Sequence, residues 1–346
     1  MPKISVLMSV HNDEQYLNAA IESIIFQTYA NFQFIIINDA STDNSFNIIN
    51  SYDDERIIKI NNIKKLGLTK SLNIGLNYAN GEFIARMDAD DISKTDRFEK
   101  QIIFLKKNET IDAVGGQKIN IDHNEKMLKP NYRYPLTDEL IKWELYFEVP
   151  FCHPTIMIRK NIFKKIGSYN ENYLFAQDFE FWKRMVINNC TLANLDDEIL
   201  YYRKVEKRES KWKKRIQNKL HLRVLADYLS YNGFMIKKDI VKYFRYCSKK
   251  SLTNNDYIIK SIILLLNIQK SYLFRNNISY ASQEIINQTA IQKIINTVKY
   301  QNGLPIVTRL NLLAMCLRIN HKAVGNYQLR SSLKSIFKEL IKTIKN

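Results

Sequence analysis

Three aspartates near residue 90 have the types and spacing that most clearly suggest chemistry in this chain. Asp88, Asp90 and Asp91 follow the apolar run Glu82–Met87 almost without a break. A buried strand that ends in carboxylates presents them at the carboxyl edge of a sheet, where open α/β folds bind ligands. Asp88 and Asp90 can then converge on one divalent cation, Mg²⁺ or Mn²⁺, which commonly bridges to a diphosphate. An isolated Asp-x-Asp is more often a solvated turn, so the surrounding sequence decides between the two interpretations.

The elements that must position these carboxylates alternate between strand and helix patterns. Nearly continuous apolar runs predict buried parallel strands, and apolar residues at helical spacing predict the helices between them. This alternation predicts a Rossmann-like α/β fold, with a mostly parallel sheet and helices on both faces. In chain order the predicted elements are strand Ile4–Ser9, helix Glu14–Phe26, strand Phe32–Asn38, helix Ser45–Ser51, strand Arg56–Asn61, helix Leu68–Tyr78, strand Glu82–Met87, strand Ile156–Arg159 and helix Asp178–Asn189.

Polar residues also follow the first two strands. Ser9, His11 and Asn12 come at the end of the first strand, and Asp39 comes at the end of the second. In a doubly wound sheet these ends lie beside the end of the strand that carries Asp88, so together they can build one pocket. Asp39 can accept hydrogen bonds from a ribose or a base. The residues after it also suit a turn that caps the next helix, and both interpretations can hold.

The charge of the chain is unevenly distributed. Residues 1–203 carry 24 Lys and Arg against 28 Asp and Glu, whereas residues 204–346 carry 28 against 7. Such asymmetry indicates a basic appendage that meets an anionic partner. Its mixed apolar and basic stretches predict helices, and no run approaches the ~20 apolar residues of a membrane span. The predicted helices are Lys211–Tyr231, Lys237–Lys249, Asp256–Ile268, Ser282–Tyr300 and Arg330–Lys345.

Three interpretations of the basic part remain open. Its charges can be solvated helix faces, a nucleic-acid surface or a surface for anionic lipid. No nucleic-acid-binding motif supports the second, so we expect no nucleic-acid partner. Each Lys or Arg near an anionic membrane surface contributes about 1 kcal/mol to binding, and we favour this interpretation.

The four cysteines lie far apart without a CxxC pair, which predicts a reducing compartment and neither a zinc site nor disulfides.

Taken together, these segments resemble the inverting family 2 glycosyltransferases of the GT-A fold, a group rich in bacterial cell-surface polysaccharide enzymes. The similar segments are Ser5–Leu17, Phe34–Asp43, Leu66–Asp91 and His153–Arg184. The resemblance covers roughly residues 3–203. It implies a GT-A domain over residues 1–203, and the change of pattern and charge after Arg203 predicts a basic helical domain over residues 204–346.

The resemblance also implies roles for individual residues. It implies that Asp90 and Asp88 bind Mn²⁺ or Mg²⁺, and that Asp178 is the catalytic base. Asp178 also suits the start of a helix, His153 a loop contact and Trp182 the core. The residues implied to bind the donor nucleotide, most often uridine, are Ser9, His11, Asn12, Asp39, Lys65 and Asp88. Those implied to face the acceptor are His153, Gln177 and Trp182.

Four positions depart from the family pattern. Ser9 replaces a usual proline, His11 a usual tyrosine and Gln177 a usual acid. A histidine that often lies near the diphosphate is replaced by Val205, so we expect no histidine metal ligand from that segment.

The function implied by the resemblance is metal-dependent, inverting transfer of a hexosyl or N-acetylhexosaminyl group. The expected donor is a UDP-sugar and the expected acceptor a glycan or lipid-linked glycan of capsule, O-antigen or lipooligosaccharide synthesis. We expect a cytoplasmic enzyme, peripheral at the inner face of the membrane. The alternatives are a sugar-1-phosphate nucleotidyltransferase, which would carry a glycine-rich, Arg-containing loop after the first strand, and a non-catalytic membrane-associated scaffold. No GxGxxG motif supports a dinucleotide oxidoreductase.

Overall fold

The computed structural model of the chain describes residues 3–129, 132–204, 211–246, 248, 252–301 and 303–319. By compactness the chain divides into two units, Met1–Val224 and Leu225–Asn346. The predicted domain boundary after residue 203 lies earlier in the chain than this division, and it stays a prediction. The predicted helix Arg330–Lys345 and the position of Val205 lie outside the described residues.

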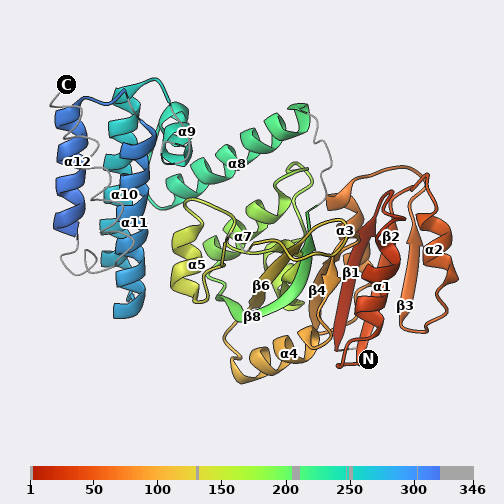
Figure 1. The fold of residues 1–346 in the computed structure, drawn as a ribbon. Helices are drawn as coiled ribbons and strands as arrows, with labels where there is room; N and C mark the ends of the chain where they lie inside the picture. Colours follow the sequence, from red (N-terminus) through yellow and green to blue (C-terminus); the bar gives the residue numbers. More distant parts are fainter. Residues whose placement is uncertain are drawn as a thin grey trace. The chain divides into compact units, whose positions relative to one another are not determined.

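In the described part of the first unit, eight strands form one sheet in the order β3-β2-β1-β4-β7-β6-β8-β5 (Figure 1). The neighbours β3, β2, β1 and β4 are parallel. β7 is antiparallel to both β4 and β6, β8 is parallel to β6, and β5 is antiparallel to β8. The strands are β1 Ile4–Val10, β2 Phe32–Asn38, β3 Ile57–Asn61, β4 Phe83–Asp88, β5 Ile92–Ser93, β6 Ala113–Ile121, β7 Met157–Arg159 and β8 Leu192–Arg203.

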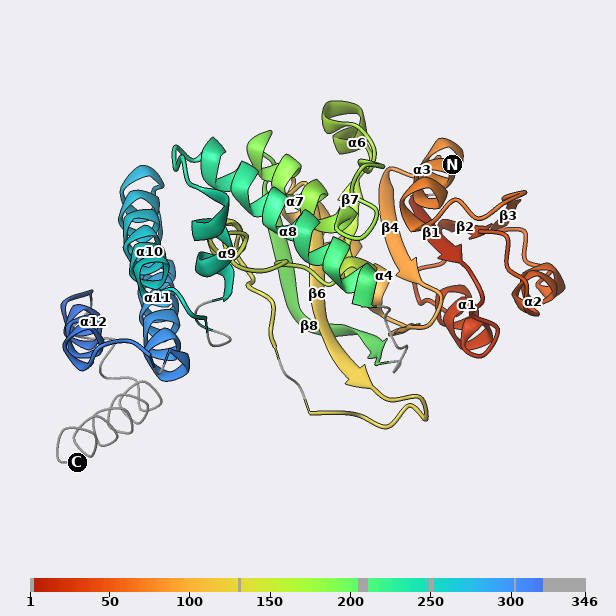
Figure 2. The ribbon, with the colours of Figure 1, turned by 90° about the horizontal axis from the view of Figure 1, so that it is seen from above.

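Helices cover both faces of the sheet, as the alternating pattern predicts. Because successive side chains of a strand point to opposite faces, Ile4, Val6 and Met8 of β1 pack in one core with residues of α1 and α4. Leu7 points to the other face, where a Cβ on Gly75 of α3 would lie 2.9 Å from Ile37 Cδ1 and 3.2 Å from Leu7 Cδ2. Figure 2 shows α1 and α3 on opposite sides of β1 and β2. The helices are α1 Leu17–Ile25, α2 Ser45–Ser51, α3 Leu68–Tyr78, α4 Arg97–Lys107, α5 Asp138–Glu144, α6 Asn161–Ile166 and α7 Gln177–Ile187, with a short 3-10 turn η1 at His153–Thr155.

The predicted elements of the first half are present, with small differences at their ends. Helix α1 begins later than predicted, because a turn in which the Leu17 amide donates to the Asp13 carbonyl precedes it. The long neighbours β6 and β8 were not predicted. They widen the sheet beyond β4 and supply one side of the cavity described below.

The second unit is helical in its described residues. Helix α8 (Lys211–Tyr231) runs across the division between the units, and α9 (Lys238–Tyr246) follows it. Helix α10 (Asn255–Arg275) starts at an N-cap in which Asn254 Oδ1 accepts from the Tyr257 amide, and it extends further than predicted. Helix α11 is Tyr280–Tyr300, and α12 (Ile306–Ile319) was not predicted. No helix among the described residues is long and apolar enough to cross a membrane.

Candidate functional site

Three strand ends meet at one edge of the sheet. Ser9 at the end of β1 is paired in register with Asp88 of β4 on one side and with Ile37 of β2 on the other. The prediction that these ends are neighbours is therefore confirmed. The order of strands brings Ser9, Asp39 and Asp88 to the same edge.

His11 and Asn12 brace the loops that follow β1 and β2. His11 Nδ1 lies 2.8 Å from the Asp39 carbonyl oxygen. Asn12 has a left-handed backbone, with a φ of 58°, and its Oδ1 accepts from the Thr42 amide at 2.8 Å. These contacts give both residues a local structural role. Their predicted contact with a nucleotide stays a prediction.

Asp39 shapes the loop that carries Lys65. Its Oδ1 accepts from Asn62 Nδ2 at 2.9 Å and from the Leu66 amide at 2.7 Å, and its Oδ2 accepts from the Gly67 amide at 2.8 Å. Burial raises the pKa of Asp39, but these hydrogen bonds outweigh burial and leave the pKa below its ordinary value. The carboxylate thus stays ionised; it is only 1% exposed, and Oδ2, which accepts one of these hydrogen bonds, keeps acceptor capacity. Lys65 is exposed on the loop that Asp39 holds.

The carboxylates of Asp88, Asp90 and Asp91 form a compact cluster, with one oxygen of each within 4.8 Å of the others. Asp91 is buried. Its Oδ1 accepts from the Arg203 amide at 2.8 Å, and its Oδ2 has no partner among the described residues. Burial, and then repulsion from Asp88 and Asp90, raise the pKa of Asp91 well above its ordinary value. A buried carboxylate oxygen without a donor, set among other carboxylates, fits a hard divalent cation. Asp91 therefore joins the two predicted metal ligands.

Arg203 closes the cluster from β8. Its Nε donates to the Asp90 carbonyl oxygen at 2.9 Å, and its Nη2 pairs with Glu125 at 2.9 Å. The guanidinium lies against the ring of Tyr16, 4.4 Å from the ring centre. These contacts fix the turn that presents Asp90 and Asp91.

A cavity of about 330 Å³ adjoins the cluster. Asp88 lies on its wall, and Asp178, at the start of α7, lies on the wall as well. Arg86 of β4 and Lys118 of β6 bring positive charge to the same cavity. The Lys118 ammonium lies 3.8 Å from the centre of the Tyr202 ring, which holds it in place.

Asp178 is a carboxylate in a protected position. Burial raises its pKa, although the Phe179 amide donates to its Oδ1 at 2.8 Å and Arg86 opposes the shift. Its side chain nevertheless keeps access to the cavity, which it lines. A carboxylate with a raised pKa is a stronger base than an exposed one, which suits it to accept a proton from a hydroxyl.

The three residues predicted to face the acceptor differ in position. Gln177 and His153 line the cavity, and Gln177 Oε1 has no partner among the described residues. His153 is buried, so its pKa is well below the ordinary value, and Nε2 lies 3.0 Å from the Tyr169 hydroxyl. For Trp182, the structure supports packing in the core, one of the two roles that its sequence position suits. Trp182 is fully buried against Phe151 and His153 and does not line the cavity, so it supports His153 from the core.

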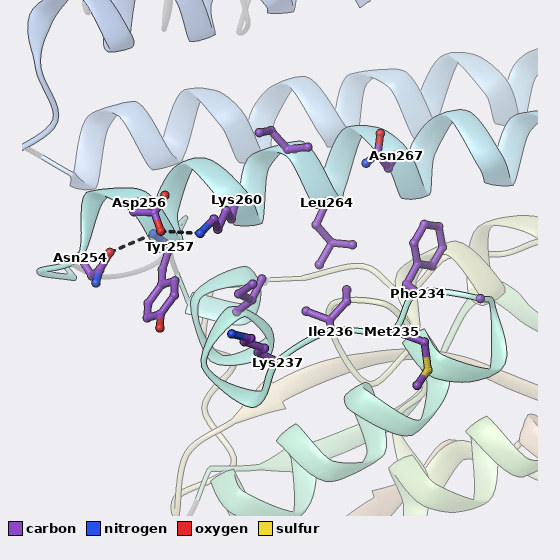
Figure 3. A pocket seen from close by; sticks show the side chains of 13 residues that line it. Phe234, Met235, Ile236, Lys237, Asn254, Asp256, Tyr257, Lys260, Leu264 and Asn267 are labelled. Carbon is purple, nitrogen blue, oxygen red and sulfur yellow. Dashed lines mark hydrogen bonds and ion pairs between the residues drawn. The ribbon is translucent and has the colours of Figure 1, made fainter.

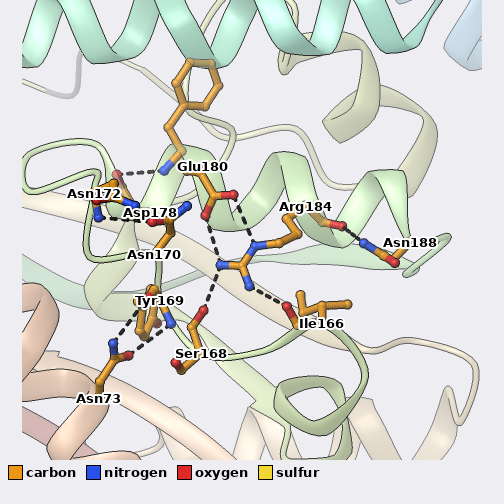
Figure 4. Close-up of polar contacts among 11 residues, drawn as sticks. Asn73, Ile166, Ser168, Tyr169, Asn170, Asn172, Asp178, Glu180, Arg184 and Asn188 are labelled. Carbon is orange, nitrogen blue, oxygen red and sulfur yellow. Dashed lines mark hydrogen bonds and ion pairs between the residues drawn. The ribbon is translucent and has the colours of Figure 1, made fainter.

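The segment before α7 is fixed by two neighbouring helices (Figure 4). Asn73 of α3 donates to the Tyr169 carbonyl at 2.9 Å and accepts from the Tyr169 amide at 3.0 Å. Arg184 of α7 pairs with Glu180 at 2.9 Å and donates to the Ser168 carbonyl at 2.8 Å. These contacts hold Tyr169, and through its hydroxyl they hold His153.

Comparison with known proteins identifies the family of the chain. The model of the family "Glycosyl transferase family 2" matches residues 5–167. An uncharacterized glycosyltransferase of Haemophilus influenzae is 30% identical over 311 residues, which are 86% of this chain and 91% of that protein. The chain belongs to glycosyltransferase family 2. The nucleotidyltransferase alternative is thereby excluded, and the enzyme is a glycosyltransferase.

Two further proteins are similar to this glycosyltransferase. The Escherichia coli UDP-Gal:alpha-D-GlcNAc-diphosphoundecaprenol beta-1,3-galactosyltransferase is 28% identical over 247 residues, 68% of this chain and 88% of that one. The structure of Staphylococcus aureus TarS 1-349 in complex with UDP-GlcNAc superposes with a TM-score of 0.56 at 15% identity. The match covers 99% of this chain and 91% of the TarS 1-349 chain, and it shows that the two share a fold.

The sequence analysis missed Arg86 and Lys118, and it named Asp91 in the acidic cluster without assigning it to the metal. A charged residue inside the apolar run of β4 was a signal for Arg86, and the adjacent acid Asp90 was a signal for Asp91. Lys118 had no such signal, because β6 itself was not predicted.

Proposed function

We propose that this glycosyltransferase moves a hexosyl or N-acetylhexosaminyl group, with inversion, from a UDP-sugar to a hydroxyl of a lipid-linked glycan. The product belongs to bacterial surface polysaccharide synthesis. The observation that carries the proposal is the cavity of about 330 Å³ that has Asp178 and Asp88 on its wall. It provides one carboxylate for proton transfer and a separate carboxylate cluster for a cation. Because the cavity offers both groups, we disfavour the alternative that the protein is a non-catalytic scaffold.

Inverting transfer requires one bond to form as another breaks. The acceptor hydroxyl attacks the anomeric carbon, its proton passes to Asp178, and the electron pair of the broken bond leaves with the nucleoside diphosphate. Asp88, Asp90 and Asp91 would hold Mn²⁺ or Mg²⁺, which when bound supplies positive charge for the diphosphate. Arg86 and Lys118 add fixed positive charge to the same cavity.

The donor and acceptor classes are proposed from chemistry and from similar proteins. Asp39, held ionised at the strand edge, can accept from a ribose or a uracil. The similar E. coli enzyme is named for UDP-galactose and a diphosphoundecaprenol acceptor, and the TarS structure contains UDP-GlcNAc. Ser9, Lys65 and Gln177 are proposed as further contacts on the basis of their positions.

A panel of nucleotides tests the donor class. Thermal unfolding of the full chain is followed with UDP, GDP, CDP and dTDP, each with and without Mn²⁺. A ligand that binds the folded state raises the melting temperature by mass action. We expect the largest rise with UDP and Mn²⁺ together. A larger rise with another nucleotide would reject uridine, and equal rises with and without Mn²⁺ would reject metal dependence.

The helical unit supports a contact with anionic lipid. From residue 225 onward the chain carries 19 Lys and Arg against 5 Asp and Glu. A hollow of about 630 Å³ lies between the segment after α8, α9 and α10 (Figure 3). Apolar side chains line it, including Met235, which is 88% exposed, and its polar residues include Lys237 and Lys260. Apolar surface beside basic residues suits the chains and headgroups of anionic lipids at the inner face of the cytoplasmic membrane.

A further inference from the structure

Arg86 is a buried cation inside the metal-binding part of the site. Only 3% of its surface is exposed, and its Nη2 forms an ion pair with Asp88. Among the described residues, its Nε and Nη1 have no hydrogen-bond partner. Arg86 therefore depends on Asp88 for its charge partner, and two of its donors are unused.

Asp88 has two competing uses. It is the partner of a buried guanidinium, and it is one of three carboxylates that converge within 4.8 Å. A divalent cation that binds the cluster draws on the same negative charge. Arg86 would then lose the partner that compensates its burial, which is costly in a protein interior. An anion that arrives with the cation removes this cost, because the two unused donors of Arg86 can bind it.

We propose that Arg86 is the resident counter-cation of the metal site and that it couples the cation to the diphosphate of the donor. The inference rests on the proposed metal-dependent transfer from a nucleotide sugar. Without a diphosphate, Arg86 competes with the cation for Asp88, and the cation binds weakly. With a diphosphate, Arg86 turns its donors to phosphate oxygens and Asp88 serves the cation. Because such coupling is reciprocal, the cation strengthens diphosphate binding by the same factor.

The test measures Mn²⁺ binding to the full chain by calorimetry, with and without UDP. In the wild type we expect UDP to strengthen Mn²⁺ binding. In Arg86→Met we expect Mn²⁺ alone to bind about tenfold more tightly, because a unit positive charge a few ångströms away is removed. The strengthening by UDP should fall by a similar factor. Arg86→Lys, which keeps the charge, should stay close to the wild type in both measurements.

Two controls separate this role from general damage. Arg184→Met removes another guanidinium that is paired with an acid, Glu180, outside the metal cluster, and it should leave Mn²⁺ binding unchanged. In a double-mutant cycle, Arg86→Met should change Mn²⁺ affinity less once Asp88→Asn is also present, because the carboxylate for which the two cations compete is gone. Arg86→Gln replaces Arg86→Met if the methionine variant does not fold.

The results that would overturn the role of Arg86 differ from the result that would reject the proposed function. Weaker Mn²⁺ binding in the neutral variants, both with and without UDP, would overturn the inference and leave Arg86 a structural residue, as would failure of both neutral variants to fold. Unchanged coupling in these variants would overturn it as well. A wild type that binds no Mn²⁺ even with UDP would instead reject the metal dependence of the proposed function.

Discussion

Asp178 and Asp88 line one cavity, but their surroundings give them different chemistry. Asp178 has a raised pKa because it is buried, and the opposing effect of Arg86 is smaller. Asp88 is paired directly with Arg86 and lies among carboxylates that fit a cation. One carboxylate is thereby suited to accept a proton and the other to bind positive charge.

The base assignment predicts a defined pH dependence. Asp178 must be deprotonated to act, so kcat/KM should rise with pH through its raised pKa, above the ordinary range near 3.9. Asp178→Asn should lower turnover by about 10²–10⁴-fold and remove this rise. UDP affinity should stay nearly unchanged, because the base faces the acceptor. A variant that loses UDP binding but keeps turnover at saturation would place Asp178 in the donor site.

The metal cluster gives a second prediction. Asp90→Asn should nearly abolish transfer and should remove the effect of Mn²⁺ on UDP binding, since an anionic ligand of a hard cation is lost. Transfer and UDP titrations with Mn²⁺ or with EDTA measure both effects. Asp43→Asn is a suitable control, because Asp43 is an acid of the neighbouring loop whose carboxylate accepts from the Ser45 and Glu14 backbone amides instead. Full activity of the Asp90 variant in EDTA would reject the metal assignment.

For single residues, the sequence predicted which residue types lie in the site better than it predicted their burial and their contacts. The carboxylates at 88 and 90 were predictable because they follow an apolar strand. Asp91 differs from its neighbours only in being buried beside Arg203, which follows from the pairing of β5 with β8. For Trp182, the family resemblance implied a place facing the acceptor, and the sequence suited the core as well. Only its packing against Phe151 and His153 separates the two.

At the scale of elements, the parallel strands β1, β2 and β4 were predictable because both of their faces are covered. Such strands read as nearly continuous apolar runs. β6 and β8 gave no such signal. β6 contains Gly115, Gly116 and Lys118, and its pairing with β8 is irregular near Gln117. Strands β6 and β8 supply Lys118 and Tyr202 to the cavity, so this part of the site could not be predicted from local sequence patterns.

The segment that holds Tyr169 should be sensitive to its contact with α3. Asn73→Ala removes two hydrogen bonds to the backbone of Tyr169, a buried residue, and should lower the free energy of unfolding by about 1–3 kcal/mol. Because Tyr169 holds His153, we also expect a higher KM for the acceptor with unchanged UDP affinity. Chemical denaturation and steady-state kinetics measure these effects. Weakened UDP binding instead would show that the segment serves the donor side.

At the scale of the whole molecule, positive charge is concentrated in the part of the chain after residue 203, and helices of that part also expose apolar residues. Trp212, 65% exposed, lies among the exposed basic residues Lys211, Lys213, Lys214 and Arg215 at the start of α8. In the second unit, Met235 and Ile263 of the hollow are 88% and 49% exposed. Exposed apolar residues beside basic ones are typical of peripheral contact with a membrane surface.

The membrane contact is tested with vesicles. We expect the full chain to sediment with phosphatidylglycerol vesicles at low salt and to be released as salt rises, since the Debye length falls from about 10 Å at 0.1 M to about 3 Å at 1 M. Neutralising Lys211, Lys213, Lys214 and Arg215 should weaken binding. Met235→Glu should weaken it too, whereas Phe274→Glu, which changes an exposed residue that does not line the hollow, should have little effect. If Met235→Glu and Phe274→Glu lose vesicle binding equally, the hollow is not the contact surface. If the wild type does not bind these vesicles at low salt, lipid binding is rejected and the basic residues are solvated helix faces.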